Sequence, residues 1–511
     1  MELQLGKQKR MMYARVFDRT EEETCSADAV VPDALGDIGA IVVTEGTFCL
    51  WNLDFSDKSA QIEGSVAADV VYAEEGGALR SFPVELPVKV RISGETLSPD
   101  ARPWLRCTLA ALDARAVNSR KVRVTARLSL SLRAYRETEL ALTDRIEGDG
   151  GTVFTRTETL RVQVPVSVEE KTFTVSETHR FTAGQPEADR LLCHTETVLL
   201  DDVSVVGSRV ILQGRVCAAV SYLLQGRVCA AVSYLQQGQM CPTVETFETQ
   251  FSQMLDCPAD TSPCLLHTTV NLTAAYLNVS AAADGAALEA EYHLVAQTVC
   301  LADTEADCVT DAYCNTAELA LERETVPAGT VQPGEPLRLS AEGTLACEAG
   351  ALTVVFRRAV VCGLTEDGCD VLVRLLVTDA EQRVSCIEKR LHLPLEPENG
   401  ARLELLSVQP EEPAVTVTAD GFLIRVTVTA RTAALQEPGF RQVTGATAQE
   451  RACPYASVPS LTIVRWGGED LWTLAKRYCS SEQLIRETNG LTDEAAMAEP
   501  PQYLLIPKTQ A

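Results

Sequence analysis

The sequence predicts a mainly β fold, with tandem β-sandwich-like repeats followed by a small βααβ domain. Three observations predict it. Apolar and polar residues alternate over long runs, as they do in strands that bury one face. Similar runs recur three times along the chain, each one after a turn signal. Near the C-terminus the spacing of the apolar residues changes to that of a helix.

Length and charge limit the possible functions. At roughly 150 residues per domain, 511 residues suggest three to four domains. The 45 Lys and Arg residues against 71 Asp and Glu residues give a net charge of −26, which disfavours nonspecific attraction to nucleic acid or to an anionic membrane surface. No stretch approaches the 18 or so apolar residues that span a bilayer. We therefore expect no nucleic-acid partner and no direct membrane insertion.

The alternation is clearest in residues 122–134, where every second residue is apolar. The same pattern returns at Leu288 to Ala296 and at Phe422 to Ala430. Short turn-forming sequences precede these runs, and an Asp-Gly pair between alternating segments is typical of a tight hairpin. The turn sequences are Asn118-Ser119, Asp284-Gly285 and Asp420-Gly421.

A second strand pattern supports repetition. Ile62 to Tyr72 aligns without gaps with Leu224 to Tyr234, and Val371 to Thr378 fills the corresponding place more loosely. The predicted division is residues 1–150, 151–310 and 311–445 for three β domains. A linker at 446–459 and a last domain at 460–511 follow.

Residues 212–223 and 224–235 are identical twelve-residue blocks. As one strand they would extend roughly 80 Å at about 3.3 Å per residue, far beyond an ordinary strand. We expect one block to pair normally while the other is extruded or forms a hairpin. An error in sequencing or assembly is the alternative.

The C-terminal pattern predicts a βααβ unit. A short strand at Ile463 to Trp466 leads to a helix that Asp470 can cap. Ser480 and Gln483 predict a capping box for a second helix, which Gly490 ends. Tyr503 to Pro507 supplies the closing strand.

This unit resembles a LysM domain. The resemblance rests on Gly468 to Trp472, Leu474 to Tyr478, Asn489 and Pro500 to Pro507. It implies a shallow groove for N-acetylglucosamine polymers or a protein partner. The candidate binding residues of this groove, including two aromatic residues of the kind that favour interfaces, are Trp466, Gly468, Glu469, Asp470, Leu471, Asn489, Gly490 and Tyr503. Glu469 and Pro501 depart from the usual Asp and Gly, and proline removes a backbone donor, which disfavours glycan binding.

The first repeat, through Val30 to Ile38, Ile62 to Gly64 and Val70 to Tyr72, resembles the SPOCS domain of SipL-type spore-coat morphogenetic proteins. Tandem SPOCS-like domains ending in LysM match the architecture of that family. The resemblance implies a noncatalytic scaffold in the mother cell of a sporulating bacterium. It also implies a location at the outer forespore surface and binding to the coat-basement ATPase, stage IV sporulation protein A.

Nothing in the sequence predicts catalysis, a metal site or a cofactor. The phosphate-binding Gly-rich loop, His-Glu-x-x-His and Gly-x-Ser-x-Gly motifs are missing. The 18 cysteines form no Cys-x-x-Cys, so zinc is not expected and most should be buried thiols. No signal-peptide pattern is visible at the N-terminus, so we expect a cytoplasmic protein. A peptidoglycan-binding LysM protein is the main alternative, and an accessory subunit of a hydrolase is a weaker one.

Overall fold

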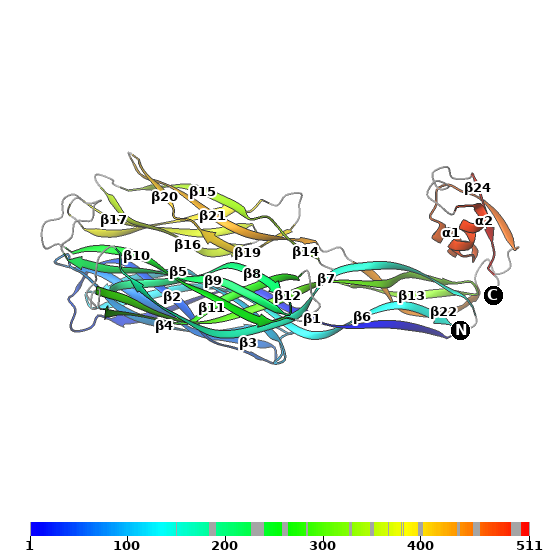
Figure 1. The fold of residues 1–511 in the computed structure, drawn as a ribbon, viewed down its shortest axis with the longest axis horizontal. Helices are drawn as coiled ribbons and strands as arrows, with labels where there is room; N and C mark the ends of the chain where they lie inside the picture. The colour runs from blue at the N-terminus through cyan, green and yellow to red at the C-terminus, as the bar shows by residue number, and fades with distance from the viewer. Residues whose placement is uncertain are drawn as a thin grey trace.

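The computed structural model describes residues 2–149, 151–182, 191–225, 240–257, 264–282, 285–326, 330–347, 352–365, 367–379, 381, 383–396, 402–418, 420–436, 440–452, 460–491 and 502–509. The chain is mainly β, with 81% in strands and two short helices among the described residues, which confirms the predicted β-rich class. Three groups of strands gather at one end of an elongated molecule (Figure 1). Longer strands extend from them as a narrow stalk, and both helices lie near the far end of this stalk, as do the two termini (Figure 1).

Unit 1 consists of β1 (Leu3–Val30), β2 (Ile38–Ser56), β3 (Ser59–Glu74), β4 (Leu79–Ser93), β5 (Arg102–Asn118) and β6 (Lys121–Gly148). They form two antiparallel sheets with strand orders β1-β6-β5 and β2-β3-β4. Both sheets contribute to one apolar core, in which Ile62 and Val66 of β3 join Leu128 and Leu130 of β6. The alternation predicted for residues 122–134 is confirmed, because each of its apolar side chains is fully buried.

Unit 2 repeats this strand order. Its strands are β7 (Val153–Arg180), β8 (Leu191–Val206), β9 (Arg209–Gln225), β10 (Met240–Asp256), β11 (Cys264–Ala282) and β12 (Gly285–Cys314). The two sheets are β7-β12-β11 and β8-β9-β10, and their facing sides share a core that includes Val220 of β9 and Tyr292 of β12. The expected turn residue Asp284 lies outside the described residues, and β12 begins at Gly285.

The duplicated block at 212–223 occupies β9, as expected for one of the two copies. Tyr222 is fully buried in β9, as Tyr72 is in β3. A Cβ on Gly214 would meet the Leu199 carbonyl oxygen at 2.4 Å, and one on Gly64 would meet the Cys49 oxygen at 2.3 Å. The first copy, residues 212–223, therefore corresponds to β3, although the sequence alignment matched the second copy, residues 224–235. Because the two copies are identical, their periodicity could not show which one forms the strand. Residues 226–239 lie outside the described part.

Unit 3 is built from shorter strands: β13 (Ala317–Val326), β14 (Thr330–Pro333), β15 (Leu337–Ala346), β16 (Thr353–Thr365), β17 (Gly368–Thr378), β18 (Val384–Pro394), β19 (Arg402–Pro410), β20 (Ala414–Thr418), β21 (Gly421–Gln436) and β22 (Phe440–Ala452). One sheet is β16-β17-β18. In the other, β14, β15, β19 and β20 all pair with β21. Val371 of β17 and Val426 of β21 belong to the core between them.

Two predicted boundaries fall inside strands. Position 310 lies within β12, which continues to Cys314, and 445 lies within β22. Residues 446–452 therefore belong to a strand that pairs with β13, although they were assigned to a linker. Their small and polar side chains carry too weak an apolar alternation to predict a strand locally.

The stalk consists of the outer halves of β1, β6, β7 and β12 together with β13 and β22. These six strands form three antiparallel ribbons. Apolar side chains from all three ribbons meet between them, among them Leu142 of β6, Leu160 of β7 and Val326 of β13. A two-stranded ribbon has little stability alone, so mutual packing of the three ribbons explains why the stalk forms.

The C-terminal module contains β23 (Leu461–Arg465), α1 (Leu471–Tyr478), α2 (Glu482–Asn489) and β24 (Tyr503–Pro507). Asp470 occupies the N-cap position of α1 without a capping side-chain hydrogen bond. The expected cap of α2 is wrong by one residue: the hydroxyl oxygen of Ser481, and not that of Ser480, accepts from Leu484 N at 3.1 Å. Ser480 instead donates to the Pro507 carbonyl oxygen, which ties the start of α2 to β24.

Candidate functional site

The predicted binding residues between β23 and α1 bond mainly to other groups within the module. The indole N–H of Trp466 donates to the Glu469 carbonyl oxygen at 2.8 Å. The Glu469 carboxylate pairs with Arg477 at 3.0 Å. Gly468 has a φ of +87°, a conformation that a side chain would strain. These contacts fix the shape of the turn, and Glu469 and Gly468 remain exposed on its outside.

The residues on the other side of the predicted groove are also structural. The Asn489 side chain donates to the carbonyl oxygens of Ile485 and Leu505 at 2.7 Å each, and it accepts from Leu505 N at 2.8 Å. Gly490 ends α2 in the left-handed conformation, with a φ of +67°. Leu471 is only 3% exposed. Because Asn489 uses both ends of its amide to join α2 to β24, it has little capacity left for a ligand.

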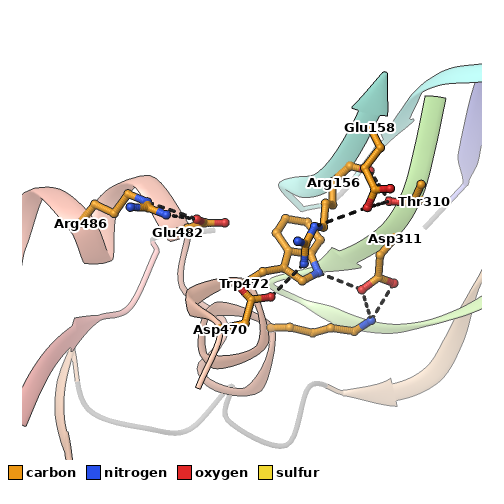
Figure 2. Close-up of polar contacts among 9 residues, drawn as sticks. Arg156, Glu158, Thr310, Asp311, Asp470, Trp472, Glu482 and Arg486 are labelled. Atoms are coloured by element: carbon orange, nitrogen blue, oxygen red, sulfur yellow. Dashed lines mark hydrogen bonds and ion pairs between the residues drawn. The ribbon is translucent and has the colours of Figure 1, made fainter. Parts of the chain in front are cut away.

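Asp470 does not face an open groove. Its carboxylate accepts from the Arg156 guanidinium at 2.8 Å, and Arg156 belongs to β7 in the stalk (Figure 2). Both side chains are roughly half exposed, so this ion pair contributes little stability by itself. It nevertheless shows which surface of the module is covered: the start of α1 lies against the stalk.

Asp311 of β12 is the main polar contact between the stalk and the module. Its carboxylate accepts from Trp472 Nε1 at 2.8 Å (Figure 2) and from Lys476 Nζ at 2.9 Å, both on α1. Arg323 of β13 adds a third donor at 2.7 Å. Burial by itself would raise the pKa of Asp311, but the hydrogen bonds from Trp472 and Lys476 outweigh burial and hold the pKa below its ordinary value. The carboxylate is therefore ionised at neutral pH.

An aromatic cluster completes the contact. The Tyr313 ring stacks on Phe154 with centroids 5.0 Å apart, and Trp472 meets its edge at 4.9 Å. The Tyr313 hydroxyl donates to the Ser480 carbonyl oxygen at 2.7 Å. Trp472 is 8% exposed, and stalk residues form part of its surroundings. Neither Asp311 nor Tyr313 could be predicted from the sequence, because no local pattern links them to α1.

The hairpin of β23 and β24 exposes an apolar surface, which we call the sheet face. It consists of Leu461 and Ile463 on β23 and of Tyr503 and Leu505 on β24. Ile463 is 65% exposed and Tyr503 is 55% exposed. Ile463 pairs directly with Leu505, so the four side chains lie on one side of the hairpin. Tyr503 is thus the predicted aromatic site residue whose ring is exposed to a partner.

A separate cavity of about 810 Å³ lies where units 1, 2 and 3 meet. Strands β2, β5, β8, β11, β16 and β19 contribute to its wall, and none of the predicted site residues does. Charges in this wall are paired across units, as in the 2.8 Å contact between Glu45 of β2 and Arg374 of β17. The cavity therefore belongs to the junction of the units and not to the predicted site.

A partly buried histidine beside this junction predicts a pH effect. His194 of β8 contacts Glu196 at 2.7 Å and Asp69 of unit 1 at 3.8 Å. Burial would lower the pKa of His194, but these carboxylates raise it to about 9. A histidine whose pKa is raised on folding stabilises fully below its ordinary pKa near 6.5, and the contribution disappears as the pH rises through about 9. We expect the free energy of unfolding to fall by about 1–3 kcal/mol over this interval.

The measurement is urea denaturation at pH 6 and at pH 9.5 for the unsubstituted chain and for His194→Gln. Subtracting the pH dependence of the variant from that of the unsubstituted chain leaves the contribution of His194 together with its coupling to Glu196 and Asp69. The His293→Gln variant is the control, because His293 is 40% exposed, its ion-pair partner Glu291 lies on its own strand, and its ring meets only the exposed Tyr276 among the described aromatic rings. Equal pH dependence in the chain and in His194→Gln would contradict the assignment.

Comparison with known proteins identifies no relative: no family model, curated protein or solved structure matches the chain. Across the described ranges, no helix has both the length and the apolar character needed to cross a bilayer. In the same ranges, no three His, Cys, Asp or Glu side chains gather as metal ligands.

Proposed function

We propose that the protein is a noncatalytic scaffold in spore coat assembly. In this proposal, units 1 to 3 are tandem SPOCS-like β-sandwich repeats, and the C-terminal module is a LysM domain. The module docks onto the coat-basement ATPase, stage IV sporulation protein A, at the forespore surface in the mother cell. The repeated strand order of units 1 and 2 and the βααβ order of the module support this interpretation.

The observation that carries the docking role is the sheet face. The module is anchored to the stalk through α1, so its orientation relative to the long body is set. The side chains of the sheet face take no part in these contacts, and two large apolar ones among them are exposed by more than half. Exposed Tyr and aliphatic side chains on a rigid element are typical of protein interfaces. The engagement of Asn489 and Asp470 in internal contacts disfavours a glycan in the predicted groove.

The test is capture of the purified ATPase by the full chain and by the double variant Ile463→Thr/Tyr503→Thr. Threonine retains a high strand propensity, so the hairpin should persist. We expect affinity to fall by at least tenfold, as for the loss of interface residues worth about 2 kcal/mol. Val417→Thr is the matched control, because Val417 is 66% exposed on unit 3 and should not affect binding.

Deletion of residues 457–511 should abolish capture. Undiminished binding by the double variant would reject the sheet face, and undiminished binding by the deletion would reject the module as the docking element. Sedimentation of the chain with peptidoglycan or chitin, without capture of the ATPase, would favour the glycan-binding alternative.

A further inference from the structure

We propose that Cys257 and Cys300 are a site of disulfide formation that joins the two sheets of unit 2. Their sulfur atoms lie 3.7 Å apart, and the side chains are 5% and 0% exposed. Cys257 directly follows β10, which belongs to the sheet β8-β9-β10, whereas Cys300 lies in β12 of the sheet β7-β12-β11. A bond between them would therefore cross the interior of the unit and link both sheets covalently. This inference does not depend on the proposed function.

The backbone around both cysteines can shift enough to bring the two sulfur atoms to bonding distance. A disulfide requires about 2.05 Å between the sulfur atoms, so the pair must close by less than 2 Å. At Cys300 the register between β12 and β7 shifts, since Cys300 pairs with Ser167 and Leu301 with Pro165. Such a bulge interrupts the ladder and permits a local shift. Cys257 lies beyond the last ladder residue of β10, where its N–H donates to Ser208 O at 2.9 Å.

The surroundings of the pair are apolar on both sides. Val210, Leu212 and Leu255 come from one sheet and Ala296 from the other. These apolar surroundings would shield a completed disulfide from reductants. Cys479 in the C-terminal module is itself disulfide-bonded, so an oxidised cysteine is already part of this fold.

The chemistry is thiol–disulfide exchange with a low-molecular-weight disulfide such as oxidised glutathione. Cys257, the more exposed of the two, loses its proton and attacks the oxidant; its sulfur bonds to one glutathione sulfur and the other leaves as a thiolate. The Cys300 thiolate then attacks the Cys257 sulfur and releases the second glutathione thiolate. In total the protein loses two protons and two electrons, and one oxidant disulfide becomes two thiols.

The experiment incubates the full chain with oxidised or reduced glutathione, alkylates remaining thiols after unfolding, and maps peptides by mass spectrometry without reduction. We expect a peptide pair linked through Cys257 and Cys300 after oxidation only. We also expect the melting temperature to rise by about 5 °C, reversibly with dithiothreitol. Cys257→Ala and Cys300→Ala should each abolish the linked pair and the rise, whereas Cys347→Ala in unit 3 should preserve both.

Peptide mapping of the unsubstituted chain decides the outcome even if an alanine variant folds poorly. Recovery of both Cys257 and Cys300 as alkylated thiols after oxidation of the folded chain would overturn the proposal. Pairing of either cysteine with a different one would overturn it as well.

Discussion

Replacing Trp104 with alanine is expected to lower the free energy of unfolding by about 3–5 kcal/mol, as for other fully buried tryptophans. Trp104 of β5 is 2% exposed and packs against Val168 and Val299 of unit 2. Its indole N–H donates to the His267 carbonyl oxygen at 3.2 Å. The Trp104 side chain of unit 1 thus fills a space that residues of unit 2 enclose. Its removal leaves a cavity at the junction of the two units.

Two arginines make the stability of the protein more sensitive to substitution of Trp104. The guanidinium groups of Arg106 and Arg133 lie 5.0 Å and 4.7 Å from the centre of the Trp104 ring. Burial, and then the neighbouring charge of Arg133, lowers the pKa of Arg106 to about 10. Arg133 forms an ion pair with Glu404 of unit 3, and Arg106 donates to the Leu406 carbonyl oxygen at 2.9 Å. The ring therefore stabilises two cations that hold unit 3 against unit 1.

The matched control is Trp51→Ala, because Trp51 is 58% exposed on β2 and should change stability by no more than about 0.5 kcal/mol. Trp104→Phe keeps a ring beneath the arginines but loses the hydrogen bond and part of the buried volume, so it should cost more than about 1 kcal/mol and less than Trp104→Ala. Guanidinium unfolding followed by circular dichroism measures all three. If Trp104→Ala and Trp51→Ala unfold at the same midpoint, Trp104 does not join the units as described.

The second large effect concerns the contact between the C-terminal module and the stalk. Asp311→Ala should shift the equilibrium between docked and released module by about 2–3 kcal/mol, or roughly 30- to 150-fold, toward release. The substitution leaves Trp472 Nε1 and Lys476 Nζ without their acceptor. Small-angle X-ray scattering should record a larger radius of gyration, and α1 should lose protection from hydrogen exchange.

Asp303→Ala is the control, because Asp303 lies on the same strand and its side chain is exposed. The lowered pKa of Asp311 also sets the sign of a pH effect. The carboxylate contributes fully above its ordinary pKa near 3.8, and docking weakens as the pH falls through the lowered value. Asp311→Asn should remove this acid-dependent release; an unchanged scattering profile for Asp311→Ala would show that the aromatic cluster alone holds the module.

The sequence by itself determined the local elements. Strict alternation predicted the buried face of β6, because a residue pattern of period two has a single low-energy arrangement when one side of a strand meets a core. Turn residues such as Asn118 placed the start of that strand within a few positions. Helical spacing and Gly490 likewise located α1 and α2. In these segments the sequence pattern and the local structure that it predicts involve the same few neighbouring residues.

Only the tertiary structure decided how these elements meet. Asp311 and Trp472 are separated by 161 positions, and nothing in their local sequences indicates that one accepts a hydrogen bond from the other. For the same reason the predicted groove residue Asp470 proved to contact Arg156 of the stalk, and Tyr503 remained exposed. Periodicity specifies which face of an element is apolar, but the partner of that face depends on the complementary shape and charge of distant segments, which come together only when the whole chain folds.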